Sequence, residues 1–263
     1  MRYLVSISVL FWCLMSCGLP KFQSNESKVL DLKKEEDPKY DFAVVIYDLA
    51  NKQYFYYNDS MANIPFSPAS TFKIPNTLIG LETGVLKDST SRLNLGLSDP
   101  TLKFAFQNSI VPYYQKLAGQ IGNQNMQDYL KRFDYGNKLI TPELTSFWLQ
   151  GDLRISAFEQ LDFLFKIEKR QLGLRPETYQ TLMDIFEPRM SHPFNLYGKT
   201  GWGYQDGKDL GWFVGFADWG KSRYLFATVM TSPGEYYGKF DFGVKRIELT
   251  KSAFQSLWNN TNF

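Results

Sequence analysis

The sequence predicts an α+β fold, in which an antiparallel sheet is flanked by terminal helices (an α/β/α sandwich) beside a helical subdomain. Strand-like runs occur near both ends of the chain, residues 104–190 have mainly helical spacing, and the last residues form one more helix. Strands and helices that are grouped in this way, instead of alternating, indicate separate layers. The 263 residues are 44% hydrophobic and 17% aromatic, which is enough for a sizeable core.

Residues 1–16 predict an export signal peptide. Arg2 supplies a positive charge, and the apolar run over residues 3–15 is too short to span a bilayer comfortably. The run ends in the sequence LMSC (residues 14–17), which resembles the lipobox of bacterial lipoproteins, where the cysteine is lipidated. A plain secretory signal with an incidental cysteine is the alternative. We expect an exported protein, in the periplasm or cell envelope, whose only membrane attachment is a lipid on Cys17.

Residues 17–40 predict a flexible tether behind this anchor, because they are polar and charged and have no apolar period. The pattern changes at Asp41, and we expect one folded domain over residues 41–263. Its first elements are two β-branched and aromatic runs, Phe42–Tyr47 and Gln53–Tyr57, which predict a hairpin.

The next expected element is a helix over Thr71–Thr83, with Pro75 near its start and Gly84 just past its end. Two more strand-like runs, Gly211–Ala217 and Tyr224–Thr231, come late in the chain. The final helix is amphipathic, because one of its faces carries Ile247, Thr250, Phe254 and Leu257.

Composition excludes several kinds of chemistry. A net charge of +2 gives no electrostatic reason to expect nucleic acid as a partner. The only cysteines are Cys13 and Cys17, so the mature domain has no disulfide, no cysteine nucleophile and no thiolate metal site. His192 is the sole histidine, which excludes a multi-histidine zinc site, and we interpret it as a surface loop residue without a catalytic part. We expect no bound metal.

The strongest chemical signal is the tetrapeptide from Ser70 to Lys73. Serine and lysine three residues apart share one face of a helix, so their side chains can meet. A serine hydroxyl needs a base to become a nucleophile, and lysine is such a base only if its pKa is depressed or if it is chemically modified. The helix start also offers the Ser70 backbone N–H to a developing oxyanion. An ordinary surface pair is the rival interpretation, but Ser70 alone among the serines has lysine three residues on.

A second motif, Lys199-Thr200-Gly201, stands at the start of a predicted edge strand. Lysine there can hold an anionic group or assist proton transfer, and threonine can hydrogen-bond a carboxylate. Glycine permits close approach of the backbone to a ligand. By itself the tripeptide would be read as a turn, and its value lies in the combination with Ser70 and Lys73.

These motifs resemble those of the class D, oxacillinase-type, serine β-lactamases of the penicillin-recognising serine enzyme superfamily. Residues 70–73 are similar to the Ser-Thr-Phe-Lys box and residues 199–201 to the Lys-Thr-Gly box. Between them, in family order, lie four similar segments: Ser109-Ile110-Val111, Tyr135-Gly136-Asn137, residues 147–151 and residues 155–160. The resemblance implies a β-lactamase/transpeptidase-like catalytic domain that hydrolyses the β-lactam ring of penicillin-type antibiotics through a serine acyl-enzyme and so confers resistance.

The resemblance also implies a role for each site residue. Ser70 would accept the acyl group, and Lys73 would be N6-carboxylated by carbon dioxide or bicarbonate to serve as the general base, with no other cofactor. Val111 would line the pocket of this carbamate, and the Trp148 indole would hydrogen-bond it. Ser109 and Lys199 would relay protons. The backbone N–H groups of Ser70 and Trp202 would form the oxyanion hole. Thr200, Gly201 and Arg246 would bind the substrate. We interpret residues 135–137 as mainly structural.

Two alternatives stay open. A D-alanyl-D-alanine peptidase or transpeptidase would share the serine, lysine and Lys-Thr-Gly elements but would deacylate slowly, and the Ser-x-Val, Tyr-Gly-Asn and Trp148 segments argue against it. A β-lactam sensor domain would stay acylated, but a full sensor needs several membrane helices and a His-Glu-x-x-His segment that this sequence lacks. The sequence departs from the family in a shorter stretch between Gly84 and Ser109 and in Pro112, and neither departure removes a catalytic group.

Overall fold

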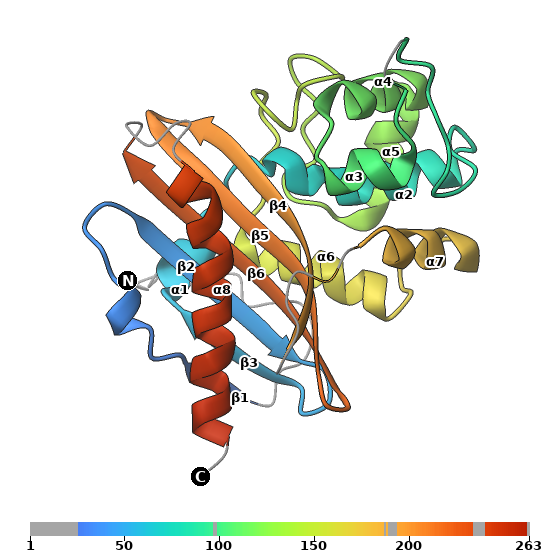
Figure 1. The fold of residues 1–263 in the computed structure, drawn as a ribbon. Helices are drawn as coiled ribbons and strands as arrows, with labels where there is room; N and C mark the ends of the chain where they lie inside the picture. The colour runs from blue at the N-terminus through green and yellow to red at the C-terminus, as the bar shows by residue number, and fades with distance from the viewer. Residues whose placement is uncertain (1–25, 97–98, 187, 189–193, 234–239, 262–263) are drawn as a thin grey trace, which may run out of the picture.

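A six-stranded sheet runs through the molecule in the order β1-β3-β2-β6-β5-β4 (Figure 1). The computed structural model describes residues 26–96, 99–186, 188, 194–233 and 240–261, so the predicted signal peptide, Cys17 and His192 lie outside the described residues. Within these ranges no helix is long and apolar enough to cross a membrane. The strands are β1 (Glu26–Val29), β2 (Asp41–Asp48), β3 (Gln53–Tyr57), β4 (Asn195–Gln205), β5 (Lys208–Trp219) and β6 (Ser222–Pro233).

Neighbouring strands are antiparallel, except that β1 runs parallel to β3. The predicted hairpin is confirmed, with Val45 of β2 opposite Tyr56 of β3. The two late strands are also confirmed, as the long pair β5 and β6, because their β-branched and aromatic residues suit a sheet that is buried on both faces. The Lys-Thr-Gly motif lies inside β4 and not at its start, since the strand extends back to Asn195.

The two faces of the sheet are covered by different helices, as the predicted sandwich requires. Along β2 the side chains alternate, so that Val44 and Ile46 belong to one core while Val45 and Tyr47 belong to the other. Helix α8 (Phe240–Thr261) covers the first face, where its Phe254 is fully buried (Figure 1). Helices α1 (Asp59–Ala62) and α6 (Ala157–Glu168) pack on the other face.

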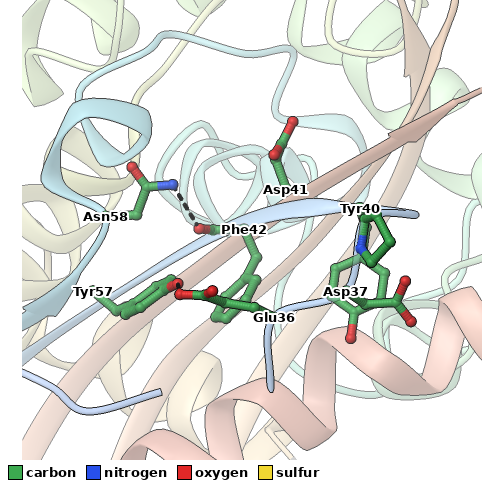
Figure 2. A pocket seen from close by; sticks show the side chains of 8 residues that line it. Glu36, Asp37, Tyr40, Asp41, Phe42, Tyr57 and Asn58 are labelled. Atoms are coloured by element: carbon green, nitrogen blue, oxygen red, sulfur yellow. Dashed lines mark hydrogen bonds between the residues drawn. The ribbon is translucent and has the colours of Figure 1, made fainter. Parts of the chain in front are cut away.

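The folded domain begins earlier than the sequence predicted. Strand β1 pairs with β3, and Leu30 and Leu32 behind it are buried. Farther on, the carboxylate of Glu35 in η1 (Lys33–Glu35) pairs with a lysine of α8 at 3.1 Å, and the Tyr57 hydroxyl donates to Glu36 at 2.6 Å (Figure 2). The tether predicted over residues 17–40 is therefore wrong for residues 26–40, because the strand pairing and the two buried leucines outweigh the charged composition.

The remaining helices lie between β3 and β4, and α2 to α5 gather to one side of the sheet (Figure 1). The helix predicted over residues 71–83 is present, with a 3-10 first turn. Of the range 104–190, the described part to residue 186 is mainly helical, apart from irregular segments at 134–156 and 169–175. These elements are η2 (Ala69–Phe72), α2 (Lys73–Glu82), α3 (Leu102–Gln107), α4 (Val111–Ile121), α5 (Asn123–Phe133) and α7 (Pro176–Ile185).

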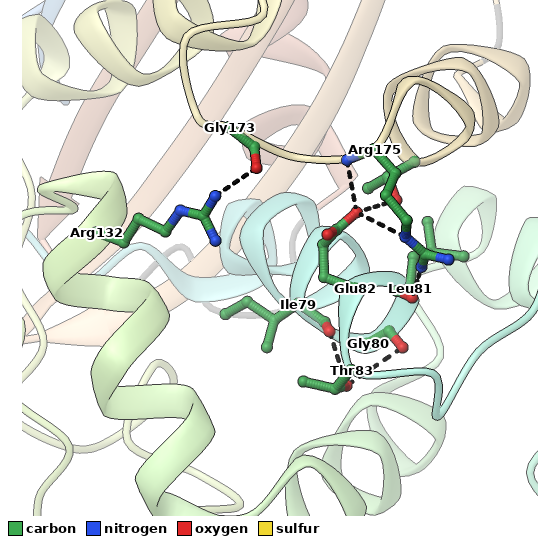
Figure 3. A network of polar contacts seen from close by, with 9 residues as sticks. Ile79, Gly80, Leu81, Glu82, Thr83, Arg132, Gly173 and Arg175 are labelled. Atoms are coloured by element: carbon green, nitrogen blue, oxygen red, sulfur yellow. Dashed lines mark hydrogen bonds and ion pairs between the residues drawn. The ribbon is translucent and has the colours of Figure 1, made fainter.

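The end of α2 is tied to its neighbours by polar contacts (Figure 3). The carboxylate of Glu82 accepts hydrogen bonds from the backbone N–H of Arg175, at 3.0 Å, and from the Thr178 hydroxyl. The Arg175 guanidinium donates to the Leu81 carbonyl. Because Arg175 caps α7 and Thr178 lies in its first turn, the last turn of α2 is held against the start of α7.

Candidate active site

Ser70 lies in the 3-10 turn that leads into α2. Ala69 before it has a φ of +46°, a left-handed conformation that is strained for a residue other than glycine. The Thr71 hydroxyl donates to the Pro68 carbonyl at 2.7 Å, and the Gln160 amide of α6 donates to the Thr71 hydroxyl at 2.8 Å. Buried side chains therefore hold the turn from within the core, while Ser70 keeps 9% of its surface exposed.

Lys73 is the first residue of α2 and is fully buried. Its Nζ donates to Ser70 Oγ at 2.7 Å, so the predicted meeting of the two side chains is confirmed. Burial removes the hydration of the ammonium and lowers the pKa of Lys73 to about 7. Among the described residues no carboxylate forms an ion pair with it. A substantial fraction of this amine is therefore neutral near pH 7, which is what activation of a serine requires.

Tyr114 of α4 faces Lys73, with its ring centroid 5.3 Å from Nζ. Its hydroxyl lies 2.9 Å from the Thr77 hydroxyl, and its carbonyl accepts from the Asn76 amide at 3.3 Å. Tyr114 does not stand out in the sequence, because an aromatic residue on the buried side of an amphipathic helix has the pattern of an ordinary core residue. One signal in the sequence could have pointed to Tyr114: it follows Val111, a predicted pocket residue, by one helical turn. Val111 is the first residue of α4 and is partly exposed.

Trp148 is fully buried, and its ring stacks on Phe72 with the centroids 5.3 Å apart. Its carbonyl accepts from the Ser67 hydroxyl at 3.0 Å. The indole Nε1 is buried and has no hydrogen-bond partner among the described residues. Such groups normally find an acceptor, because leaving a buried donor unpaired costs about 1–3 kcal/mol.

Asn137 closes the irregular loop that carries Trp148. Its side-chain amide donates to the Asp152 carbonyl at 2.7 Å, and its side-chain oxygen accepts from the Arg154 backbone N–H at 3.0 Å. The Asn137 N–H donates to the Arg154 carbonyl at 3.0 Å as well. These bonds join the two ends of the loop, in agreement with a structural role for residues 135–137.

Lys199 is 2% exposed on β4, and its Nζ donates to the Ser109 hydroxyl and, at 3.0 Å, to the Thr200 carbonyl. Ser109 lies in the turn between α3 and α4, where its φ is +54°. The structure thus brings together two predicted site residues that are 90 positions apart in the chain.

Strand β4 lies directly against the Ser70 turn. A Cβ at Gly201 would stand 3.1 Å from the Pro68 carbonyl oxygen and 3.3 Å from the Thr71 methyl group, so glycine allows this close approach. The backbone of Trp202, the next residue, is consequently beside the turn that holds Ser70. The two main motifs of the sequence meet here, from a helix start and from an edge strand.

Arg246 reaches the same strand from α8. It is 9% exposed, and its guanidinium donates to the Gly201 carbonyl and lies 5.8 Å from the centre of the Trp202 ring. Arg246 stands almost two turns inside α8, because the helix begins at Phe240. The predicted substrate-binding residues therefore gather at the central part of β4.

Comparison with known proteins agrees with this geometry. Residues 25–243 match the family model of the penicillin-binding protein transpeptidase domain. The β-lactamase OXA-48 of Klebsiella pneumoniae is 36% identical over 199 residues, which are 72% of this chain and 75% of that protein. The probable β-lactamase YbxI of Bacillus subtilis is 34% identical over 203 residues, 74% of this chain and 76% of that protein.

Solved structures show the same relationship. The class D β-lactamase of Sebaldella termitidis superposes with a TM-score of 0.81 at 34% identity, covering 88% of this chain and 98% of that chain. The C-terminal domain of the Bacillus licheniformis BlaR penicillin-receptor superposes with a TM-score of 0.78 at 27% identity, covering 89% and 97%. Motifs, site geometry and relatives therefore agree, and the chain belongs to the class D β-lactamases, within the family of penicillin-binding protein transpeptidase domains.

Proposed function

We propose that this protein hydrolyses β-lactams through an acyl-enzyme formed on Ser70. The observation that carries the proposal is the 2.7 Å contact between Ser70 Oγ and the Nζ of Lys73, whose pKa is lowered by burial to about 7. A serine hydroxyl beside a neutral amine has the base that it needs to attack a carbonyl carbon. The relatives that are named β-lactamases support the substrate class.

Acylation uses both serine–lysine pairs. Lys73 takes the proton of Ser70 while Oγ bonds to the lactam carbonyl carbon, and the oxyanion is held by the backbone N–H groups of Ser70 and Trp202. The carbon–nitrogen bond of the ring then breaks, and the leaving nitrogen receives a proton through Ser109 and Lys199. The hydrogen bond between these two side chains supports that relay.

Lys73 is proposed to carry an N6-carboxylate, and the residues present fit this group. A neutral amine is the form that reacts with carbon dioxide, and the buried indole N–H of Trp148 would donate to an oxygen of the carbamate. Val111 and Tyr114 would border it from α4. When present, the group supplies an oxygen base inside an apolar pocket. Carbon dioxide or bicarbonate is the only cofactor that the proposal requires.

The carboxylate of the substrate is assigned to Thr200 and Arg246, with Gly201 allowing close approach of the strand. A guanidinium suits this task because its donors match the two oxygens of a carboxylate. The position of Arg246 supports the assignment, because its guanidinium already contacts the carbonyl of Gly201 at the end of the Lys-Thr-Gly motif.

Export and lipid anchoring are proposed from residues 1–17 alone. The protein would reside in the periplasm or cell envelope with a lipid on Cys17. Mass spectrometry of the mature N-terminus tests this: a diacylglyceryl cysteine is expected, and Cys17→Ser should abolish it. A lipid-free N-terminus would instead indicate a plain secretory signal.

Steady-state and burst kinetics on one penicillin, with and without bicarbonate, test the function. We expect repeated turnover, and a gain in rate when bicarbonate is added to protein that has lost the carbamate. A stoichiometric burst without turnover would overturn the hydrolase assignment. That outcome would favour a β-lactam sensor, a second candidate that the similarity to the BlaR penicillin-receptor domain supports.

A further inference from the structure

The Trp202 indole is held on the α8 side of the sheet by residues of β5 and α8. Its Nε1 donates to a carboxylate oxygen of Asp209 on β5 at 3.2 Å. The Phe242 ring lies 5.4 Å away, centre to centre, and the Arg246 guanidinium 5.8 Å away. Gly243 between them lacks a side chain, and a Cβ there would stand 3.3 Å from the Trp202 ring. The ring thus fits closely against the helix that carries Arg246.

Asp209 is a fully buried carboxylate. It is the second residue of β5, next to the β4–β5 hairpin turn, and lies opposite Tyr204 of β4 and Ser232 of β6. One of its oxygens accepts from Trp202, and the other, Oδ2, has no hydrogen-bond partner among the described residues. A buried carboxylate with so few partners is unfavourable for folding, and an apolar residue of similar volume would often be neutral or better. The stability of the sheet therefore does not explain Asp209.

The presence of a buried carboxylate at Asp209 is explained by the placement of Arg246. An arginine side chain has many rotamers, and ordering it costs about 2 kcal/mol of rotamer entropy. Arg246 is ordered by the Gly201 carbonyl and by the Trp202 ring beneath its guanidinium. The ring can direct the guanidinium only if its own orientation is fixed. A hydrogen bond from the indole N–H to a charged oxygen fixes that orientation more strongly than a neutral acceptor would.

We propose that Asp209 is a positioning residue that sets the affinity of the site for the substrate carboxylate. It fixes the Trp202 ring, and the ring holds the Arg246 guanidinium in the direction from which it binds the carboxylate. Asp209 touches neither the substrate nor the reacting atoms. This inference rests on the proposed function, because it takes Arg246 as the residue that binds the carboxylate of a β-lactam.

The test measures KM and kcat for a penicillin and for its methyl ester, which has no free carboxylate. Asp209→Ala should raise KM for the penicillin about tenfold, as expected for the loss of a hydrogen bond to a charged group, with little change in kcat. KM for the ester should stay the same. Asp209→Asn keeps an oxygen acceptor and should restore most of the affinity.

Trp202→Phe removes the indole donor and provides an independent test. It should raise KM for the penicillin as Asp209→Ala does, and the double variant should show no further increase, because both changes break the same contact. If Asp209→Ala does not fold, as thermal unfolding would show, Trp202→Phe still decides the question, and an unchanged KM for the penicillin would overturn the proposal.

Asp206→Asn is the matched control, because this carboxylate lies in the same β4–β5 hairpin but is exposed. It should leave both KM values unchanged. An equal rise in KM for penicillin and ester in Asp209→Ala, or a fall in kcat alone, would show that Asp209 is only structural. If the unmodified protein turns over neither compound, the proposed function fails, which is distinct from failure of the role given to Asp209.

Discussion

The two serine–lysine pairs of the site are built from different parts of the chain. Ser70 and Lys73 are three residues apart at the start of one helix, whereas Ser109 and Lys199 come from a turn and an edge strand 90 residues apart. Both lysines are buried. Lys73 faces the Tyr114 ring and its pKa is lowered to about 7, whereas Lys199 faces the Phe106 ring and has a carbonyl as a second acceptor.

The difference teaches that the surroundings, and not the residue types, assign the roles. An amine that loses its hydration without gaining a carboxylate partner gives up its proton readily and can act as a base. The amino group of Lys199, which donates to a hydroxyl and to a carbonyl, is ordered as a donor. The same two side chains can therefore remove a proton at one side of the site and deliver one at the other.

The largest difference between the two serine–lysine pairs is expected when the serine hydroxyl of each pair is removed. Ser70→Ala should abolish the acyl-enzyme and lower kcat/KM by about 10⁴-fold or more, because the nucleophile is lost. Ser109→Ala should still form the acyl-enzyme, only more slowly. Intact-mass measurement after mixing with a penicillin distinguishes the two. A normal acyl-enzyme in Ser70→Ala would mean that the pairs have been assigned the wrong way round.

The second contrast concerns proton delivery. Lys199→Met should slow acylation by about 10²–10⁴-fold, the range for loss of a general acid–base group. Single-turnover acylation rates measure this. Because the carbamate is assigned to Lys73, the residual activity of Lys199→Met should still rise with bicarbonate. Loss of the bicarbonate effect would show that the two lysines do not act separately.

The third contrast concerns the pocket of Lys73. Trp148→Phe keeps a ring to stack on Phe72 but removes the buried N–H, and it should slow deacylation by about 10–100-fold, as expected for one hydrogen bond to a charged group. Acylation should change less, so that acyl-enzyme accumulates. Trp219→Phe, at the far end of β5, is the control and should change neither step. Equal loss of both steps in Trp148→Phe would contradict its proposed role.

The smallest expected effect is that of pH. The pKa of Lys73 in the folded protein, about 7, is below the ordinary lysine value of 10.5. The acylation rate should therefore rise about tenfold between pH 6 and pH 8, because only the neutral amine can accept a proton or take up carbon dioxide. The unfolded chain binds more protons than the folded one between these two pKa values, so stability should also rise with pH over that interval. A pH–rate profile checks the change in acylation rate, and unfolding curves at several pH values check the change in stability. An acylation rate that does not change with pH would contradict the lowered pKa of Lys73, on which its role as the base depends.

Much of this site could be predicted from the sequence because its first pair is local. Ser70 and Lys73 meet through helix geometry alone, and strands β2, β5 and β6 stand out as nearly continuous β-branched and aromatic runs. The contact of Ser109 with Lys199 was implied by family resemblance, since nothing in the residues themselves joins positions so far apart. Strand β1 was missed because the sequence ESKV is polar and has too few apolar residues to show alternation.

Tyr114 and Asp209 were missed for a different reason. Tyr114 has the pattern of a core aromatic, and only the fold shows that it faces an amine. Asp209 lies among charged residues at the start of β5, where the sequence suggests an exposed hairpin turn. Its full burial depends on the pairing of β4, β5 and β6 and on the cover that α8 provides.

In the described sheet β4 is an edge strand, and this position has a consequence for solubility. Open edges invite pairing with foreign chains, and proteins usually block them with charges, prolines or short strands. Here full blocking is incompatible with the proposed substrate site, which lies along this edge. Among the described residues, the buried side chain of Lys199 and the bridge from Pro188 to Tyr197 protect part of this edge. Changes that flatten or lengthen β4 should therefore cause aggregation during folding, even where the catalytic residues are intact.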